Sequence, residues 1–430
     1  MLNLNAHLEE LEEIGTPIGM GLVGAGQMGR GLVSQLFLMK GIKPCVVCDG
    51  VVERAIEAYK FAGVDEDDIR VAESAGEAQE ASESGYYVVT PDVSVVAEMP
   101  AVDVVVEATG VTNVGALVAF NSIANGKHVV LLNVETDVTV GPILKKLADS
   151  AGVVYTASAG DEPGVAKELY DFASGLGFEV LVIGKGKNNP LNRRANPDTE
   201  RERAAKEGAS PKMLASFSDG TKTMVEMAAV SNATGFLPDV PGMHGPEGTW
   251  ANLTQVLRLK SEGGVLNRYG VVEYVNGVAP GVFVIVTSPS DTIKAQMRYL
   301  KMGDGPNYLL YRPFHLTSLE TPVSVARAYL YREPTIAPLG RFCSEVVAVA
   351  KKDLRTGERL DGIGMYSVYG LIMTAEEARS KGALPIGLVT DKVKMLRDAK
   401  EGEVITYDAV ELDESAFVTQ LRKMQDQLIK

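Results

Sequence analysis

Residues 18–29, IGMGLVGAGQMG, constrain the fold of this chain more than any other stretch. They are typical of a buried strand that runs straight into a glycine turn and a helix, with Gly24, Gly26 and Gly29 at the GxGxxG spacing. One glycine permits the tight turn, the second lets the backbone approach a pyrophosphate, and the third lets helix and strand pack closely. Apolar residues then recur at helical spacing over residues 32–39. The stretch therefore predicts a dinucleotide-binding unit.

An acidic residue, Asp49, follows the second apolar strand, residues 45–48, near the spacing expected for a ligand of the cofactor ribose. A carboxylate at this position accepts hydrogen bonds from ribose hydroxyls but repels the 2′-phosphate of NADP. The first arginine after it is Arg54. Between NAD and NADP, the residues themselves thus favour NAD.

Strand and helix patterns alternate along the first 160 residues, which predicts a doubly wound parallel sheet with helices on both faces. Two later strands end in residues 107–110, EATG, and in Asn133 with Glu135, and such a sheet binds its cofactor at these carboxyl ends. For Asn133 and Glu135, a turn amide and a solvated carboxylate are equally good interpretations. The predicted cofactor-binding residues are Gly24, Gly26, Gln27, Met28, Gly29, Asp49, Thr109, Gly110 and Asn133.

Composition argues against several kinds of partner. The 42 basic and 56 acidic residues give a net charge of −14, which disfavours nucleic acid and anionic membranes. Apolar runs are shorter than a membrane span, and acidic residues stand near the N-terminus where a signal peptide would be basic, so we expect a cytoplasmic protein. Three cysteines are too few for a disulfide framework. Cys45 and Cys48 are expected to be packing residues, on opposite faces of one strand.

The second informative stretch is GKGKNNPLN, which follows a predicted strand over residues 178–183. In an extended chain its two lysines face the same side, and three asparagines add amide donors and acceptors. Such a cluster can hold a phosphate or carboxylate, and a lysine beside a carbonyl can transfer a proton. An exposed polar turn is the alternative interpretation. The predicted substrate-binding and catalytic residues in this stretch are Lys185, Lys187, Asn188, Asn189 and Asn192.

Glu226 and two histidines complete the set of candidate catalytic groups. Glu226 stands within an apolar segment, so it either reaches the lysine pocket or forms a buried structural ion pair. His315 follows a strand-like stretch, and His244 lies in a loop between glycines and prolines. Each histidine is either a substrate contact or a packing residue. The Asp219-Gly220 dipeptide predicts a hairpin turn.

The length of 430 residues predicts two or three domains. From residue 338, short strands are broken by glycine turns, which is typical of a small β module. The predicted fold class is α/β: a Rossmann domain over residues 1–160, an α+β catalytic domain over residues 161–337, and a β-rich domain with a C-terminal helix over residues 338–430. The amphipathic last helix and the large apolar fraction favour a homo-oligomer.

The N-terminal half resembles the dinucleotide domain of homoserine dehydrogenase, and the C-terminal segment resembles SAF domains, named for sialate synthase and antifreeze proteins. The combination is similar to the bacterial DXR-like proteins over nearly the whole chain. The motifs that carry this resemblance are GAGQMG, EATG, NVETDVTVGP, GDEP, GKGKNNPLN, DGTKTMVEMAAVSNATG, PGMHGP, EGGVL, RPFHLTSLE, KKDLRTGERLD, LPIGLV and KEGEVITYDAV.

Some DXR-like proteins convert 1-deoxy-D-xylulose 5-phosphate to 2-C-methyl-D-erythritol 4-phosphate in isoprenoid biosynthesis. The resemblance implies a skeletal rearrangement, reduction of the resulting aldehyde by NADPH, and a divalent metal such as Mg or Mn. This chemistry needs an anion clamp and groups that polarise adjacent oxygens. GKGKNNPLN fits the clamp, and Glu226 and Glu262 are candidate metal ligands. Asp49 departs from what NADPH requires.

Three functional hypotheses follow from the sequence. The first is an NAD(P)-dependent oxidoreductase of the DXR-like type, acting on a small phosphorylated polyhydroxy substrate. The second is an NAD-dependent alcohol dehydrogenase of the homoserine or sugar-acid type, in which no rearrangement occurs. The third is a non-catalytic sensor that binds NAD and uses the SAF-like segment to bind a sugar or a partner.

Overall fold

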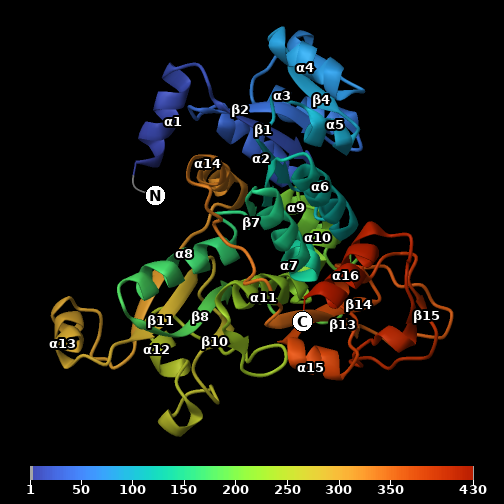
Figure 1. The fold of residues 1–430 in the computed structure, drawn as a ribbon. Helices are drawn as coiled ribbons and strands as arrows, with labels where there is room; N and C mark the ends of the chain where they lie inside the picture. Colours follow the sequence, from blue (N-terminus) through green and yellow to red (C-terminus); the bar gives the residue numbers. More distant parts are fainter. Residues whose placement is uncertain (1–2, 430) are drawn as a thin grey trace. The chain divides into compact units, whose positions relative to one another are not determined.

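A computed structural model describes residues 3–429 of the chain, which form two compact units (Figure 1). Unit 1 contains the residues up to Asp161, Leu316–Gly340, and those from Ala416 on. Unit 2 contains Glu162–His315 and Arg341–Ser415. The chain thus returns to unit 1 twice, whereas the sequence predicts three consecutive domains.

Unit 1 is built on a parallel seven-stranded sheet with the strand order β3-β4-β2-β1-β5-β6-β7. Its strands alternate with helices along the chain, so the predicted doubly wound α/β fold is confirmed. The strands are β1 (Ile18–Val23), β2 (Ile42–Cys48), β3 (Ile69–Val71), β4 (Tyr87–Thr90), β5 (Val104–Glu107), β6 (His128–Leu131) and β7 (Tyr155–Ala157).

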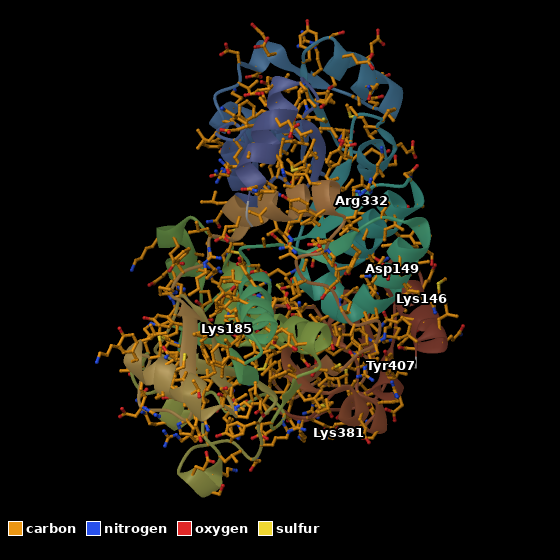
Figure 2. The ribbon with its side chains drawn as sticks, turned by 60° about the vertical axis from the view of Figure 1, so that its left-hand side comes forward. Lys146, Asp149, Lys185, Arg332, Lys381 and Tyr407 are labelled. Atoms are coloured by element: carbon orange, nitrogen blue, oxygen red, sulfur yellow. The ribbon has the colours of Figure 1, made fainter. Side chains whose placement is uncertain are left out.

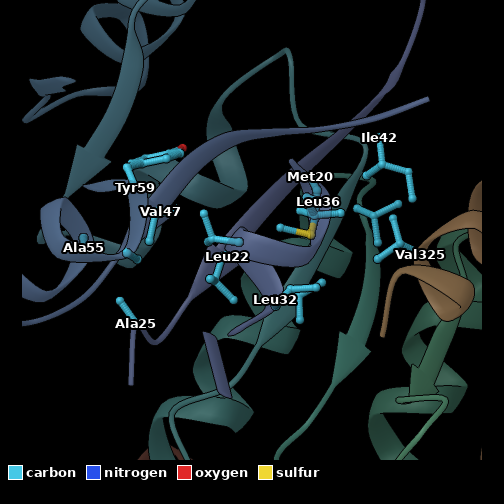
Figure 3. Packing of buried hydrophobic residues seen from close by; sticks show 14 of the residues in the cluster. Met20, Leu22, Ala25, Leu32, Leu36, Ile42, Val47, Ala55, Tyr59 and Val325 are labelled. Atoms are coloured by element: carbon cyan, nitrogen blue, oxygen red, sulfur yellow. The ribbon is translucent and has the colours of Figure 1, made fainter. Parts of the chain in front are cut away.

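Helices cover both faces of this sheet. The helices of unit 1 are α1 (Leu4–Glu13), α2 (Gln27–Leu36), α3 (Val52–Phe61), α4 (Ala75–Glu83), α5 (Val93–Glu98), α6 (Thr112–Ala124), α7 (Val134–Ala151), α14 (Thr321–Tyr331) and α16 (Phe417–Leu428). One apolar cluster joins the sheet to α1, α2, α3 and α14, and a second cluster joins it to α4, α5 and α6. In the first cluster Leu22, Leu32 and Val325 are fully buried (Figure 3). Each such side chain contributes about 1.5–3 kcal/mol by leaving water.

A bulge in β2 changes the predicted orientation of the two cysteines. Met20 of β1 pairs with Pro44, but Gly21 pairs with Val46, so Cys45 is an extra residue in the ladder. Both Cys45 and Cys48 are buried in the same apolar cluster. The prediction that they pack in a strand is therefore confirmed, and the prediction of opposite faces is wrong because the bulge shifts the alternation.

Unit 2 contains a five-stranded mixed sheet with the order β12-β11-β8-β10-β9. Strand β8 is parallel to β10 and antiparallel to β11. The strands are β8 (Glu179–Lys187), β9 (Leu237–Pro238), β10 (Val271–Asn276), β11 (Val282–Thr287) and β12 (Tyr308–Arg312). The helices of unit 2 are α8 (Glu162–Gly175), α9 (Arg201–Glu207), α10 (Pro211–Ser218), α11 (Thr221–Thr234), α12 (Leu253–Val256), α13 (Asp291–Tyr299) and α15 (Ala375–Ser380). This is the α+β arrangement predicted for the middle of the chain.

The C-terminal segment divides between the two units. The antiparallel pair β13 (Ser344–Ala350) and β14 (Val368–Thr374) and the short pair β15 (Lys394–Met395) and β16 (Val410–Glu411) belong to unit 2. Helix α16 belongs to unit 1, where Phe417 packs edge-on against Phe120 and Gln425 accepts a hydrogen bond from Ile143. An amphipathic helix needs a surface for its apolar face, and α6 and α7 supply that surface.

Two further predictions bear on the fold. The Asp219-Gly220 hairpin prediction is wrong: Asp219 is the C-cap of α10, and Gly220, with a φ of 86°, is the N-cap of α11. Left-handed glycine joins helices as well as strands, so the dipeptide alone does not distinguish the two turns. Within residues 3–429, none of the helices combines the length and apolarity that a bilayer crossing needs.

Candidate functional site

The glycine turn after β1 has the geometry of a dinucleotide-binding turn. Gly24 has a φ of 102°, and a Cβ on it would lie 2.7 Å from the carbonyl carbon of Ala108. A Cβ on Gly29 would lie 1.9 Å from the Gly24 oxygen, so α2 can approach the turn only with glycine there. A Cβ on Gly26 would meet no atom of the chain within 4 Å. The chain itself does not require glycine at this position, but a pyrophosphate on the backbone would.

Asp49 is held directly against this turn. Its Oδ2 accepts a hydrogen bond from the Ala25 amide at 2.9 Å, and its Oδ1 accepts one from the Val51 amide at 2.9 Å. A carboxylate has about four acceptor positions, so two remain for ribose hydroxyls. The predicted contacts Gln27 and Met28 are the first residues of α2, at the helix N-terminus that binds anions in this fold.

A buried carboxylate, Glu107, supports the predicted cofactor loop at the end of β5. Its Oε1 accepts hydrogen bonds from the amide and the hydroxyl of Thr109, and burial raises its pKa to about 7. Asn133 begins α7, and its side chain accepts a hydrogen bond from the Thr136 amide at 3.2 Å. Gly110 is exposed and has a φ of 68°. Glu107 was not among the predicted cofactor-binding residues, although an acidic residue at the end of an apolar strand is a usable signal.

Unit 1 therefore fits a dinucleotide. The three glycines leave the backbone accessible, a carboxylate stands where a ribose binds, and the polar loops after β5 and β6 lie at the carboxyl edge of the parallel sheet. These positions are the ones predicted from the sequence. Whether each residue contacts the cofactor stays a prediction.

The GKGK sequence in β8 is explained by the two faces of the unit 2 sheet. Gly184 and Gly186 face a tightly packed side, where a Cβ would lie 2.3 Å from the Phe283 ring or 2.4 Å from a backbone nitrogen. Lys185 and Lys187 alternate with them and face α8 and α11. Both lysines are buried, at 6 % exposure each. The prediction that they share one side is confirmed, but they lie within the strand and not in the connection after it.

Lys185, labelled in Figure 2, belongs to unit 2 and forms ion pairs with two carboxylates. Its ammonium lies 2.7 Å from Glu162 of α8 and donates a hydrogen bond to Glu226 of α11. Burial by itself would lower the pKa of Lys185, but the two carboxylates outweigh burial and raise that pKa above its usual range. Lys185 is therefore a permanently charged cation, and its two carboxylate partners more than balance its charge. Glu226 thus forms a buried ion pair with Lys185, which was one of the two interpretations of this residue, and its role in catalysis stays a prediction. Glu162 was not among the residues predicted from the sequence.

Lys187 lies in a different environment from Lys185. Its ammonium donates a hydrogen bond to the Phe217 carbonyl at 2.9 Å and has no carboxylate within 4 Å among the described residues. Burial, and then the Lys185 ammonium nearby, lower the pKa of Lys187 to about 8. A buried lysine with a pKa close to physiological pH can both donate and accept a proton. This perturbed lysine makes the face of β8 a candidate active site.

His315 and Glu162 extend the site. His315 Nε2 lies 3.4 Å from Glu162 Oε1, and the His315 side chain is 14 % exposed. An imidazole and a carboxylate at this spacing are ligand types that divalent cations accept. Glu262, the other candidate metal ligand, is exposed and accepts a hydrogen bond from Tyr269. A metal requirement stays a prediction.

The three predicted asparagines lie at the surface beyond β8. Asn188 and Asn192 are exposed, and Asn189 is half-buried. The Asn192 side chain accepts a hydrogen bond from the Arg194 amide at 3.1 Å, which closes a local turn. Their role in substrate binding stays a prediction.

His244 lies in a separate cluster of unit 2. Its Nδ1 lies 2.9 Å from Glu273, and its Nε2 lies 3.5 Å from Asp239. The hydrogen bond to Glu273 raises the pKa of His244. Both carboxylates are buried, so the imidazolium balances their charge, and this environment supports the interpretation of His244 as a structural residue.

Comparison with known proteins gives a family match in the middle of the chain and solved structures of low similarity. The family model described as "Oxidoreductase DRL, catalytic domain" matches residues 160–321. A search of curated proteins finds no significant match. The matched family covers the β8 lysines, Glu162, Glu226 and His315.

Solved structures with similar folds include three dehydrogenases. A levoglucosan dehydrogenase in complex with NADH and L-sorbose is 18% identical over 42% of this chain and 47% of that chain, with a TM-score of 0.29. A probable dehydrogenase from Thermotoga maritima is 14% identical over 74% and 90%, with a TM-score of 0.39. The myo-inositol dehydrogenase from Lactobacillus casei, in complex with NAD(H) and myo-inositol, is 13% identical over 70% and 68%, with a TM-score of 0.33.

The chain spans about half the length of the first of these structures. At these identities and TM-scores the likenesses say nothing about the substrate of this chain. The homoserine dehydrogenase-like, DXR-like and SAF-like parts of the resemblance stay predictions. Residues 160–321 match an oxidoreductase catalytic domain, and unit 1 has the parallel seven-stranded sheet expected of a dinucleotide-binding fold. Both findings agree with the expectation of an oxidoreductase, and the activity of the chain itself stays a prediction.

Proposed function

We propose that this protein transfers hydride between a nicotinamide cofactor and a carbon of a small polyhydroxy substrate, with Lys187 as the proton-transfer group. The buried position of Lys187, with a pKa of about 8, carries the proposal. The bound cofactor supplies or accepts the hydride. In oxidation, the neutral Lys187 amine takes the hydroxyl proton as the carbonyl forms; in reduction, the Lys187 ammonium returns that proton to the oxygen.

Lys185 and its two carboxylates have a positioning role in this proposal. Glu162 and Glu226 together carry one more negative charge than the Lys185 ammonium, so the triad offers acceptors to substrate hydroxyls. His315, beside Glu162, adds a further polar contact. A triad with a net negative charge is a poor clamp for a phosphate. A substrate with an anionic group therefore needs a binding position for that group outside the triad.

The pH dependence of turnover tests the proton-transfer role. Oxidation needs the neutral Lys187 amine, so its rate is expected to rise about tenfold per pH unit up to pH 8 and then level off. Reduction needs the ammonium and is expected to fall above pH 8. Lys187→Met is expected to lower kcat by about 10²–10⁴-fold. Lys392→Met, which changes an exposed lysine, serves as the matched control.

A rate of oxidation that rises with pH, together with a rate of reduction that falls with pH, would support Lys187 as the general acid and base. A Lys187→Met enzyme with unchanged kcat and an unchanged pH profile would overturn the assignment. Absence of turnover with either NADH or NADPH across hydroxyketone phosphates, sugars and hydroxy acids would remove the enzymatic proposal and favour the NAD-binding sensor.

The resemblance to DXR-like proteins suggests a finer substrate, 1-deoxy-D-xylulose 5-phosphate, and a rearrangement before reduction. The hydrogen bond between Asp49 and the glycine turn favours NAD, and with it an NAD-linked dehydrogenase that leaves the carbon skeleton intact. Product analysis by carbon NMR distinguishes the two reactions, because only the reductoisomerase yields the branched skeleton. Repeating the assay with and without Mg or Mn tests the predicted metal requirement.

A further inference from the structure

Arg193 is a second cation in unit 2 whose charge no carboxylate balances. Its guanidinium donates a hydrogen bond to the Asp219 carbonyl at 2.8 Å and lies 4.6 Å from the centre of the Tyr369 ring. No carboxylate lies within 4 Å of it among residues 3–429. The next residue, Arg194, has a counter-charge: it is exposed and forms a bidentate ion pair with Glu401. Arg193 was not among the residues predicted from the sequence.

Arg193 and Lys187 converge on the same short turn. Lys187 donates to the Phe217 carbonyl and Arg193 to the Asp219 carbonyl, two residues apart at the end of α10. The Asp219 carboxylate acts on Lys187 only from a distance, because its oxygens are engaged by the Lys351 ammonium at 2.7 Å and by the Thr221 amide at 2.7 Å. The two cations thus leave a local excess of positive charge inside a protein of net charge −14.

The donors of this pair exceed the acceptors that the chain supplies. A guanidinium has five N–H donors and an ammonium has three, and in each group the structure gives one donor a protein carbonyl. Lys187 is buried and Arg193 is half-buried, and cations withdrawn from water without a close counter-charge are costly unless a ligand supplies that charge. The planar donor edge of arginine matches two oxygens of a phosphate or a carboxylate.

We propose that Arg193, beside Lys187, forms an oxyanion subsite that binds the phosphate or carboxylate group of the substrate. This inference rests on the proposed function, because it assigns the bound oxyanion to a substrate. The subsite can nevertheless be tested with a free oxyanion and without turnover. Since Lys187 is the proton-transfer group, the anionic group binds close to the reacting oxygen. The subsite therefore selects a short substrate, such as a hydroxyketone phosphate or a hydroxy acid, over an uncharged sugar.

A structural role makes a different prediction. Cations near the last carbonyls of α10 also stabilise the end of a helix. If Arg193 does only this, its replacement lowers the free energy of unfolding and leaves oxyanion binding unchanged. Stability and binding therefore have to be measured on the same variants.

The test uses the full chain and two probes, inorganic phosphate and acetate, in calorimetric titrations with thermal unfolding in parallel. Arg193→Met is expected to weaken binding of the preferred probe at least tenfold. Arg194→Met, the neighbouring exposed arginine, is expected to bind as the wild type does. Arg193→Lys keeps the charge and is expected to give intermediate affinity. Its affinity for the probe also tests the subsite if Arg193→Met does not fold.

Each result decides the proposal. Phosphate binding that depends on Arg193 assigns a phosphate monoester, and acetate binding that depends on Arg193 assigns a carboxylate. Equal affinity in Arg193→Met, Arg194→Met and the wild type, or no binding of either probe to the wild type, overturns the subsite. Oxyanion binding that depends on Arg193 but without any turnover keeps the subsite and removes the proposed function. If the enzyme turns over but oxyanion binding does not depend on Arg193, the proposed function is kept and the subsite is removed.

Discussion

The glycine turn offers the sharpest prediction, because its glycines have different structural reasons to be glycine. In Gly29→Ala the new Cβ would lie 1.9 Å from the Gly24 oxygen, where ordinary contacts begin at 3.4 Å. The turn or α2 must therefore move by about 1.5 Å. Overpacking of this kind costs about 1–3 kcal/mol, and the opposing obstacle is backbone, which cannot rotate away. Alanine regains about 1 kcal/mol of helix propensity.

Because the obstacle is backbone, we take the upper end of this cost, about 3 kcal/mol, so that Gly29→Ala is expected to lose about 2 kcal/mol net and to lower Tm by roughly 4–8 °C. Gly26→Ala meets no atom of the chain, so its stability should change by less than about 1 kcal/mol, the cost of a poorer helix cap. Its affinity for NAD⁺ should nevertheless fall about tenfold or more, since the methyl group occupies the pyrophosphate position. The two variants thus separate stability from cofactor binding.

Thermal unfolding by circular dichroism and calorimetric titration with NAD⁺ and NADP⁺ measure the two effects. Gly76→Ala is the matched control, because this glycine lies in α4 and its Cβ would also meet no atom within 4 Å. Unaltered NAD⁺ affinity in Gly26→Ala would show that the turn does not bind the cofactor. If Gly29→Ala melted at the same temperature as Gly76→Ala, the close-packing argument would be wrong.

Two buried titratable groups give further predictions. Burial raises the pKa of Asp137 from 3.8 to about 6, so ionisation lowers stability as pH rises between these values, by about 3 kcal/mol in total. Asp137→Asn keeps an acceptor for the Tyr155 hydroxyl, and its stability relative to the wild type should rise by up to that amount between pH 4 and pH 7.5 in urea unfolding. The raised pKa of His244 has the opposite consequence: its ion pair with Glu273 stabilises below the ordinary pKa of 6.5, and this contribution is lost as pH rises through the raised value. His244→Gln should therefore destabilise the protein more at pH 6 than at pH 9, and an equal loss at both pH values would show that the imidazolium is not the stabilising form.

The sequence by itself determined the cofactor-binding half of the protein. Strand, glycine turn, helix and acidic strand end are local patterns, each set by neighbouring residues. The parallel sheet then follows, because strands joined by helices pack in few ways. Asp49 could be placed against the turn for the same reason. The shared side of Lys185 and Lys187 was also readable, since residues two apart in a strand face one way.

Tertiary structure alone decided which groups meet in unit 2. Glu162 and Glu226 come from separate helices, so nothing in their sequence neighbourhoods shows that both balance Lys185 and leave Lys187 as the perturbed lysine. The bulge at Cys45 and the docking of α16 are likewise products of long-range packing. A pKa and an unbalanced charge depend on burial and on neighbours distant in the chain. The sequence motif thus identified the two lysines as candidate site residues, but only the tertiary structure showed that their environments, and therefore their pKa values, differ.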